Sequence, residues 1–233
     1  MTAEMSAQSP AGDTLSPLHV YPLAPSAPVA ADLRRRASRL FDPGQPIPGD
    51  VAWSGDHVLN PDWAEHAPQR KAAAVLVLLA GDRSGDPVIL LTERAAHLSA
   101  HAGQIALPGG KIEPGETPGQ TALREAEEEV ALPARAVELV GLTEPYATRT
   151  GFLVTPVVGI LRAAAQLRPD PGEVAGAFVA PWSYVMDQSN TAEIRLTMNG
   201  RERRALEIHW GSKRIWGVTA GILRVVQERL FAL

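Results

Sequence analysis

Three glutamates, Glu125, Glu128 and Glu129, have the residue type and spacing to bind a metal ion. They fall on a predicted helix from Thr117 to Val130, where the intervals i, i+3 and i+4 place them on one face. Carboxylates this close repel one another unless a cation neutralises them. Oxygen ligands with no histidine or cysteine nearby favour Mg²⁺ or Mn²⁺ over zinc. The alternative is an ordinary charged face in contact with solvent.

A glycine-rich loop leads into this helix, and local chemistry sets the ends of the helix. Gly109-Gly110 opens the loop. Thr117 is expected as the N-cap, and Pro118 suits the first helical position. Pro133 disfavours helical geometry at the residue before it and so ends the helix. We therefore expect a loop–helix–loop unit that presents the glutamates.

Another face of the helix carries Ala122, Ala126 and Val130, a narrow stripe of small residues that can pack closely on a sheet. Apolar runs bounded by turn residues supply the strands of that sheet. The predicted strands are Ala73 to Ala80, Val88 to Thr92, Ala136 to Leu142, Leu153 to Leu161, Phe178 to Ala180, Ile194 to Met198 and Ala205 to His209. Asn199-Gly200 predicts a hairpin turn between the last two. With a second amphipathic helix at Val218 to Leu230, the elements indicate a mixed α/β fold.

One domain with an N-terminal extension accounts for the 233 residues. The extension, residues 1–70, begins with a segment rich in Pro, Ala and Ser. We expect it to be partly disordered, with one helix at Ala31 to Phe41. Residues 71–233 form the folded domain, including the C-terminal helix.

The composition excludes several classes of protein. A content of 45% hydrophobic and 21% charged residues is typical of a globular protein. The net charge of −4 offers no basic surface to a nucleic-acid backbone, so we expect no nucleic-acid partner. Without cysteine there is no disulfide framework, thiolate metal site or thiol nucleophile. No apolar run is long enough to span a bilayer and no signal-peptide pattern opens the chain, so we expect no membrane association and a cytoplasmic location.

The loop and the acidic helix together resemble the Nudix box. Gly110, Glu116, the pair Arg124-Glu125 and the pair Glu128-Glu129 stand at the intervals of that motif. The resemblance implies a Nudix α/β/α sandwich, with a mixed β-sheet and a loop–helix–loop metal site, and hydrolysis of a diphosphate. A divalent cation suits this reaction because it offsets the negative charge of the diphosphate and lowers the pKa of the attacking water.

The resemblance also implies a role for each residue of the box. The implied metal ligands and catalytic carboxylates are Glu125, Glu128 and Glu129. Arg124 orients them for catalysis, and Glu116 is a supporting residue. Glu173 stands where many Nudix enzymes have an acidic residue that faces the metals, with an exposed loop glutamate as the alternative. Ala131 stands where the box usually has glycine, so we expect an altered helix exit.

The segment before the box resembles the signature of the coenzyme A diphosphatase branch of this family. The matching positions are Leu90, Leu91, Thr92, Arg94, Ala95, Gly103, Pro108, Gly109 and Gly110. The resemblance implies that Arg94 contacts a substrate phosphate and that Gly109 and Gly110 line the substrate site. The alternative for Arg94 is a surface arginine at a strand end. Leu107 replaces a phenylalanine of the signature, and Ser99 replaces an arginine whose cation would bind an anionic substrate.

The implied activity is metal-dependent hydrolysis of the diphosphate bond of coenzyme A or its thioesters, giving adenosine 3′,5′-bisphosphate and (acyl-)4′-phosphopantetheine. The partner is then a small nucleotide substrate, with the oligomeric state open and a homodimer as one option. One alternative is a Nudix pyrophosphatase acting on ADP-ribose or another nucleoside diphosphate derivative. An alternative of another class is a non-catalytic, nucleotide-binding regulatory module, which the presence of all three box glutamates disfavours. The acidic net charge disfavours a decapping enzyme.

Overall fold

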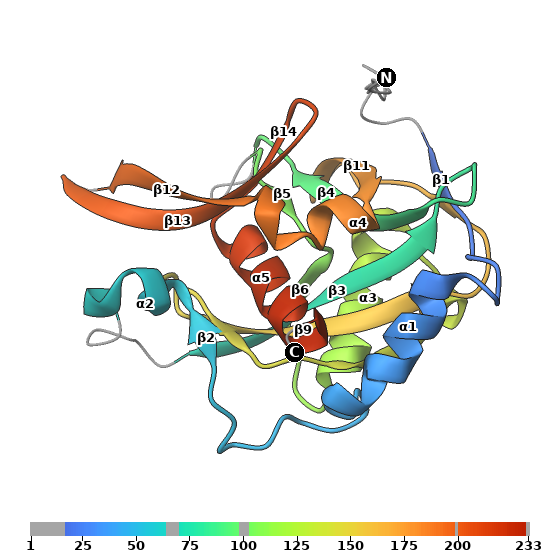
Figure 1. The fold of residues 1–233 in the computed structure, drawn as a ribbon, viewed down its shortest axis with the longest axis horizontal. Coiled ribbons are helices and arrows are strands. Elements are labelled where there is room, and N and C mark those ends of the chain that lie inside the picture. The colour runs from blue at the N-terminus through green and yellow to red at the C-terminus, as the bar shows by residue number, and fades with distance from the viewer. Residues whose placement is uncertain (1–16, 64–69, 98–102, 199, 232–233) are drawn as a thin grey trace.

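A mixed β-sheet forms the centre of the chain (Figure 1). The computed structural model describes residues 17–63, 70–97, 103–198 and 200–231. Within these residues the strands of the sheet are β2 Ser54–Gly55, β3 Lys71–Gly81, β4 Pro87–Arg94, β5 Ile105–Ala106, β6 Gly109–Lys111, β7 Val137–Leu142, β8 Tyr146–Ala147, β9 Phe152–Leu161 and β11 Val174–Pro181. Six follow the order β11-β4-β3-β9-β8-β2, while β5 pairs with β4, β6 with β3 and β7 with β9. The β3–β9 and β2–β8 pairs are parallel and the other pairs antiparallel, so the predicted mixed sheet is confirmed.

β3 and β9 lie side by side in the middle of the sheet. Their parallel register places Leu76 beside Val157, and both side chains are fully buried. Strands covered on both faces read as continuous apolar runs, which is why the sequence predicts both of them. The observed strands exceed the predicted ones, Ala73 to Ala80 and Leu153 to Leu161, by one or two residues at an end.

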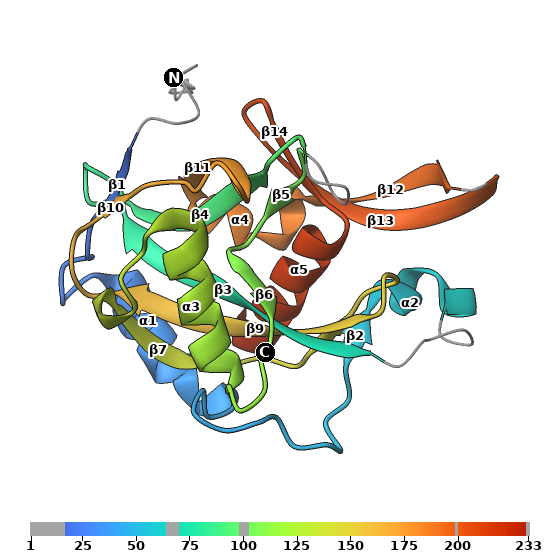
Figure 2. The same ribbon diagram turned by 180° about the vertical axis from the view of Figure 1, so that it is seen from behind.

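Helices cover both faces of the sheet. They are α1 Pro28–Arg36, α2 Asp56–Leu59, α3 Pro118–Val130, α4 Trp182–Val185 and α5 Val218–Phe231, with 3₁₀ turns at Ala37–Arg39, Pro61–Trp63, Ala134–Ala136 and Gln188–Asn190. α1 and α5 lie on the face nearer the viewer in Figure 1, and α3 lies on the other face, nearer the viewer in Figure 2. Side chains alternate along β3, so Leu76 and Leu78 pack with α3 while Val77 and Leu79 pack with α1 and α5. The predicted α/β/α sandwich is confirmed.

The N-terminal segment packs on this sandwich. β1 (Leu18–Val20) pairs antiparallel with β10 (Ala165–Leu167) in a separate two-stranded sheet. Ala30 and Leu33 of α1 are buried in the same cluster as the apolar side chains of α5. This part of the extension therefore contributes to the core.

The helix predicted over Ala31 to Phe41 is present but lies earlier in the chain. It begins at Pro28 and ends at Arg36, and the 3₁₀ turn Ala37–Arg39 follows it. Proline suits the start of a helix because its φ is already helical and its missing N–H needs no partner there. The apolar pattern alone does not mark this start.

A second sheet of three strands extends from the body (Figures 1 and 2). Its strands, in spatial order, are β12 Thr191–Met198, β13 Arg201–Trp210 and β14 Lys213–Trp216. β12 and β13 are antiparallel, with Met198 opposite Arg201 beside the turn, so the predicted hairpin is confirmed. β14 contacts β4 through an ion pair of 2.6 Å between Lys213 Nζ and Glu93 Oε2.

Candidate active site and metal centre

α3 begins with a capping box. The Thr117 hydroxyl accepts the Gln120 N–H at 3.3 Å, and the Gln120 side chain accepts the Thr117 N–H at 2.8 Å. These reciprocal bonds satisfy two backbone N–H groups that have no partner inside the helix. Pro118 occupies the first turn, so the expected N-cap and helix start are confirmed.

α3 ends at a left-handed residue, Ala131, with φ 56° and ψ 33°. The Leu132 N–H donates to the carbonyl of Ala126 at 3.2 Å, a bond typical of helices that end at glycine. We expected alanine to alter the helix exit, and that expectation is wrong. Ala131 adopts the left-handed conformation itself, which costs about 1–2 kcal/mol for a residue with a Cβ. The buried side chain of Leu132 holds the turn in place.

The inner face of α3 sets the distance between the helix and the sheet. Ala122, Ala126 and Val130 are fully buried, and they pack in one cluster with Ala74 and Leu76 of β3. Small side chains on this face let the helix approach β3 closely. The predicted stripe is confirmed.

Arg124 links the loop to the acidic residues of α3. Its Nε donates to Glu116 Oε1 at 2.7 Å, and its Nη2 donates to the carbonyl of Lys111 at 3.1 Å. Its Nη1 donates to Glu125 Oε1 at 2.9 Å and to Glu128 Oε2 at 2.8 Å. The contact with Glu116 is the largest cause of a raised pKa at Arg124, so the guanidinium stays charged. One cation thus positions three carboxylates.

Glu116 is fixed from several sides. Besides Arg124, the Thr121 hydroxyl donates to Glu116 Oε2 at 2.7 Å and the Glu113 N–H donates to the same oxygen at 3.0 Å. The Arg124 hydrogen bonds, followed by the Thr121 bond, lower the pKa of Glu116 to about 2. At neutral pH this residue is an ionised anchor for Arg124.

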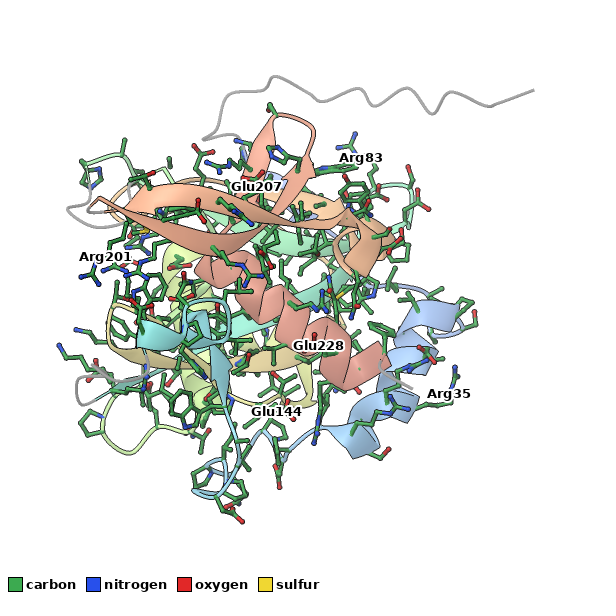
Figure 3. All side chains as sticks on the ribbon, turned by 60° about the vertical axis from the view of Figure 1, so that its left-hand side comes forward. Arg35, Arg83, Glu144, Arg201, Glu207 and Glu228 are labelled. Carbon is green, nitrogen blue, oxygen red and sulfur yellow. The ribbon has the colours of Figure 1, made fainter. Side chains whose placement is uncertain are left out.

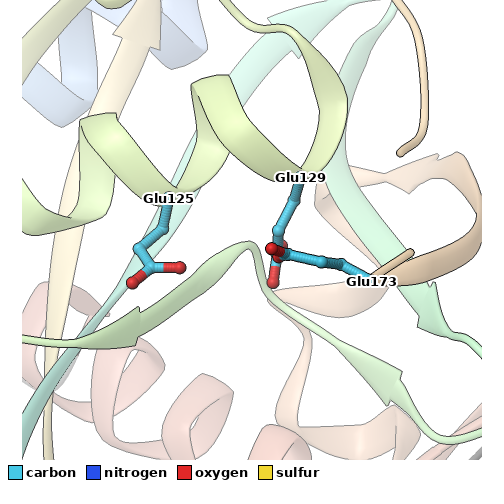
Figure 4. Close-up of side chains that lie close together, drawn as sticks. All are labelled: Glu125, Glu129 and Glu173. Atoms are coloured by element: carbon cyan, nitrogen blue, oxygen red, sulfur yellow. The ribbon is translucent and has the colours of Figure 1, made fainter. Parts of the chain in front are cut away.

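Glu125, Glu129 and Glu173 bring their carboxylates together (Figure 4). Each supplies an oxygen within 4.8 Å of the others. Glu125 and Glu129 come from α3, and Glu173 comes from the loop before β11. Glu128 does not belong to this group and binds Arg124 instead. Of the four glutamates predicted to hold metal, the structure brings three together.

The loop that carries Glu173 is fixed by Asp170. Its carboxylate accepts the Gly172 N–H at 2.8 Å, and its carbonyl accepts the Glu173 N–H at 3.0 Å. The Asp170 N–H donates to the carbonyl of Glu129 at 2.9 Å, which ties the loop to the end of α3. Our reading of the sequence missed Asp170, although Asp-Pro-Gly is a recognised turn signal.

Glu129 is the buried member of the cluster, at 3% exposure. Burial raises the pKa of Glu129 to about 8. The charge of Arg94 opposes this rise, while Glu125 and Glu173 add to it, and a Gly109 backbone hydrogen bond again lowers it. The Oε2 atom of Glu129 has no hydrogen-bond partner among the described residues. A buried carboxylate oxygen without a donor, in a set of oxygen ligands, fits a hard divalent cation.

Gly109 and Gly110 are required by close contacts. A Cβ on Gly109 would lie 2.3 Å from the carbonyl oxygen of Ala74, and a Cβ on Gly110 would lie 2.3 Å from Oε1 of Glu125. Both residues belong to β6, which pairs with Ala74 and Val75 of β3. The absence of side chains therefore lets this strand lie directly beside the acidic cluster.

Arg94 ends β4 near the cluster. It pairs with Val174, the residue after Glu173, and its backbone N–H donates to the carbonyl of Gln104 at 3.0 Å. Its charge acts on Glu129, as the lowering effect on that pKa shows. Of the two departures from the upstream signature, Leu107 is buried in the core, and Ser99 lies outside the described residues.

Comparisons with known proteins show to which family this chain belongs. The family model of the NUDIX domain matches residues 68–197. The chain is 36% identical over 176 residues to a protein of Yersinia pestis named "Uncharacterized Nudix hydrolase NudL", covering 75% of this chain and 87% of that protein. The protein of the same name from Yersinia pseudotuberculosis matches equally. The solved structure of the Nudix hydrolase RenU from M. smegmatis is 31% identical, with a TM-score of 0.41, covering 51% of this chain and 73% of that chain.

The chain belongs to the Nudix family. It is a Nudix hydrolase, an enzyme of the pyrophosphatase class, and such enzymes act on small nucleotide derivatives with the help of divalent metals. Among the described helices, none combines the length and the apolar character needed to cross a membrane.

Proposed function

We propose that this enzyme hydrolyses the diphosphate of coenzyme A or its thioesters, giving adenosine 3′,5′-bisphosphate and (acyl-)4′-phosphopantetheine. The convergence of Glu125, Glu129 and Glu173 carries the reaction. The choice of coenzyme A as substrate is supported by the segment from Leu90 to Gly110, which resembles the signature of the coenzyme A diphosphatase branch. This segment ends at the β6 glycines, beside those carboxylates.

We infer that Glu125, Glu129 and Glu173 hold the metal ion, with Glu128 as a further candidate ligand from the same helix. Their oxygen atoms favour Mg²⁺ or Mn²⁺. The bound cation offsets the charge of the diphosphate and lowers the pKa of the attacking water.

The other residues act around this centre. We infer that Arg94 binds a phosphate group through its fork of N–H donors, supported by its place at the end of β4 near Glu129. Gly109 and Gly110 let β6 lie directly beside Glu125, and we infer that their backbone lines the substrate site there. Arg124 is a positioning residue that acts through the glutamates it binds, and Glu116 supports it. A glutamate of the cluster accepts the proton of the water.

We further propose that residues 71–233 form the catalytic domain and residues 1–70 an extension. The family match, which begins at residue 68, supports this division. The contacts of α1 with the core mean that the two parts would share one folding unit.

The test is product analysis with Mg²⁺ or Mn²⁺ and coenzyme A, acetyl-coenzyme A, ADP-ribose or a diadenosine polyphosphate. Glu129→Gln and Glu173→Gln each remove a charge from the cluster with little change in shape. Glu127→Gln is the matched control, since Glu127 is exposed on the same helix and lies outside the cluster. We expect wild type and Glu127→Gln to cleave coenzyme A, and the two cluster variants to lose about a hundredfold or more in kcat.

Each other outcome has a distinct meaning. If the enzyme preferred ADP-ribose or a dinucleotide and the same two variants lost that activity, the metal site would stand and the substrate assignment would change. Ser99, which replaces an arginine of the signature, would then explain the change of substrate. Equal activity in all variants would remove the cluster from the mechanism. No cleavage of any substrate with either metal would favour a nucleotide-binding module.

A further inference from the structure

β12 is the outer strand of the three-stranded sheet. Its neighbour on one side is β13, and among the described residues no strand pairs with its other side. Figures 1 and 2 both show β12 on the rim of a hairpin that extends from the body. A long, regular edge strand presents unpaired N–H and C=O groups to any strand that can match it.

The side chains of β12 divide cleanly between its two faces. The apolar face carries Ala192, Ile194 and Leu196, and the polar face carries Thr191, Glu193, Arg195 and Thr197. The pairing with β13 runs without a register shift from Thr191 to Met198, and no proline interrupts it. β12 therefore lacks the proline, the bulge and the short length that often prevent edge pairing, and its two charged side chains, Glu193 and Arg195, are of opposite sign.

We propose that two copies of this chain associate through their β12 strands, paired antiparallel about a two-fold axis at Ile194. In this register Glu193 of each copy lies opposite Arg195 of the other. Ile194 lies opposite itself, and Thr191 lies opposite Thr197. Every residue from Thr191 to Thr197 meets a partner of the same face and of compatible chemistry, as a two-fold interface requires.

The direction of the backbone groups agrees with this register. In an antiparallel ladder, alternate residues direct both N–H and C=O toward the same neighbouring strand. Met198 and Arg201 are opposite one another beside the turn, so the even-numbered residues of β12 face β13. Glu193 and Arg195 are odd-numbered, and their backbone groups therefore face the open edge, where the proposed pairing uses them.

Neighbouring registers are disfavoured by charge. Moving the axis by one residue toward the N-terminus places Glu193 opposite Glu193, and moving it toward the C-terminus places Arg195 opposite Arg195. Like charges directly opposite one another destabilise a strand pair. The register centred on Ile194 is the one that converts both contacts into Glu–Arg pairs.

The charges of β13 extend the same pattern. Glu193 forms an ion pair with Arg204, and Arg195 lies 3.4 Å from Glu202. These pairs are diagonal, since Arg195 lies directly opposite Arg204 and Glu193 opposite Leu206. In the dimer they would continue through the Glu193–Arg195 contacts into a zigzag of alternating charge, Glu202–Arg195–Glu193–Arg204. The side chain of Arg195 is 72% exposed, so it is free to contact the second copy. Pairing of one strand buries little surface, so we expect a weak dimer that depends on concentration.

The experiment is sedimentation velocity of the full chain over a concentration series. Wild type should shift toward dimer as its concentration rises. Arg195→Glu places Glu opposite Glu, and Glu193→Arg places Arg opposite Arg, so each variant alone should dimerise about tenfold more weakly or worse. In an equal mixture of the two variants every contact is again Glu–Arg, so dimer should return as the mixed species.

Arg83→Glu is the matched control, with the same change of charge on the exposed β3–β4 turn, far from Arg201 and the hairpin tip in Figure 3. It should dimerise like wild type. Unchanged circular dichroism would show that each variant is folded. A wild type that stays monomeric, a dimer that tolerates both reversals, or a mixture that stays monomeric would each overturn the proposal. None of these readouts depends on the substrate of the enzyme.

Discussion

Arg124 is the side chain through which the loop and the acidic helix act as one unit. Its guanidinium binds Glu116, Glu125 and Glu128 and the carbonyl of Lys111. A lysine could not replace it, because an ammonium group lacks the planar fork that serves several acceptors at once. The position of Glu125, one member of the acidic cluster, therefore depends on a residue outside that cluster.

Replacing Glu116 by Gln should expose this dependence through pH. The pKa of Glu116 in the folded protein, about 2, lies below the ordinary value of 4.5. Its stabilising effect is therefore present above pH 4.5 and is lost as the pH falls toward 2. At neutral pH we expect Glu116→Gln to lower the free energy of unfolding by about 1–3 kcal/mol. Urea unfolding at several pH values should show this difference shrinking below pH 4.5, and a difference independent of pH would contradict the assignment.

Gly110→Ala should weaken metal binding more than it weakens the fold. The added Cβ would lie 2.3 Å from Glu125 Oε1, so that carboxylate must move. Loss of one well-placed ligand should lower the affinity for Mn²⁺ about tenfold or more, as measured by calorimetric titration. Gly49→Ala is the control, because nothing lies within 4 Å of a Cβ there. Equal affinities in the two variants would show that Glu125 is not a ligand.

The sequence predicts the residues of the site better than their arrangement. Glu125 and Glu129 meet in one cluster, and Glu173 joins them from a loop far away in the chain. Helical spacing places Glu128 beside both Arg124, at i,i+4, and Glu125, so it could not show which of the two Glu128 joins. The sequence also could not show that the Asp170 N–H binds the carbonyl of Glu129, because that contact forms only when the loop folds against the end of α3.

At the scale of elements, α3 of the loop–helix–loop ends in the left-handed backbone conformation that glycine favours, although the residue there is Ala131. Ala131 is the only non-glycine residue with a positive φ among those the structure describes. The hydrogen bond from Leu132 to Ala126 and the burial of Leu132 outweigh the strain. A turn is thus fixed by its surroundings as well as by its own residue.

Ala131→Gly should stabilise the enzyme. Glycine adopts a left-handed φ without a Cβ clash, so we expect a gain of about 1 kcal/mol. For a chain of this size that corresponds to a rise of roughly 2–4 °C in Tm. Ala134→Gly, in the following 3₁₀ turn, should show no such rise. Differential scanning calorimetry measures both, and a lower Tm for Ala131→Gly would mean that the left-handed exit is misplaced.

Strands with strong apolar patterns, such as β3, β4, β7 and β9, could be predicted from sequence. Short strands such as β5, β6 and β8 could not. β6 contains two glycines, which disfavour a strand in isolation, and it forms because β3 lies beside it. Tertiary contacts define these elements.

At the scale of the whole molecule, the N-terminal segment packs on the face of the sheet opposite the acidic cluster. Leu33 of α1 is 2% exposed, and its cluster includes Leu223 and Leu230 of α5. The Arg34 guanidinium also forms an ion pair of 2.8 Å with Glu138 on β7. Removal of this segment would therefore expose the core.

Leu33→Ala should lower the free energy of unfolding by about 2–5 kcal/mol, the usual result of a large-to-small change in a packed core. Arg35→Ala on the same helix should change it by about 0.5 kcal/mol or less, because the Arg35 side chain is 68% exposed. Chemical denaturation compares the two. Similar small effects would show that α1 is dispensable to the core.

Because β3 and β9 pair in parallel, the centre of the sheet is built from segments far apart in the chain. The strands β4 to β8 and the helix α3 all come between them. Closing such a long loop loses entropy before the contacts that compensate for it can form, so high contact order should make folding slow. β3 is apolar and, in the folded protein, is covered on both faces. During synthesis it emerges well before β9. That interval is when the nascent chain is most exposed to aggregation, which makes chaperone access during translation a determinant of yield.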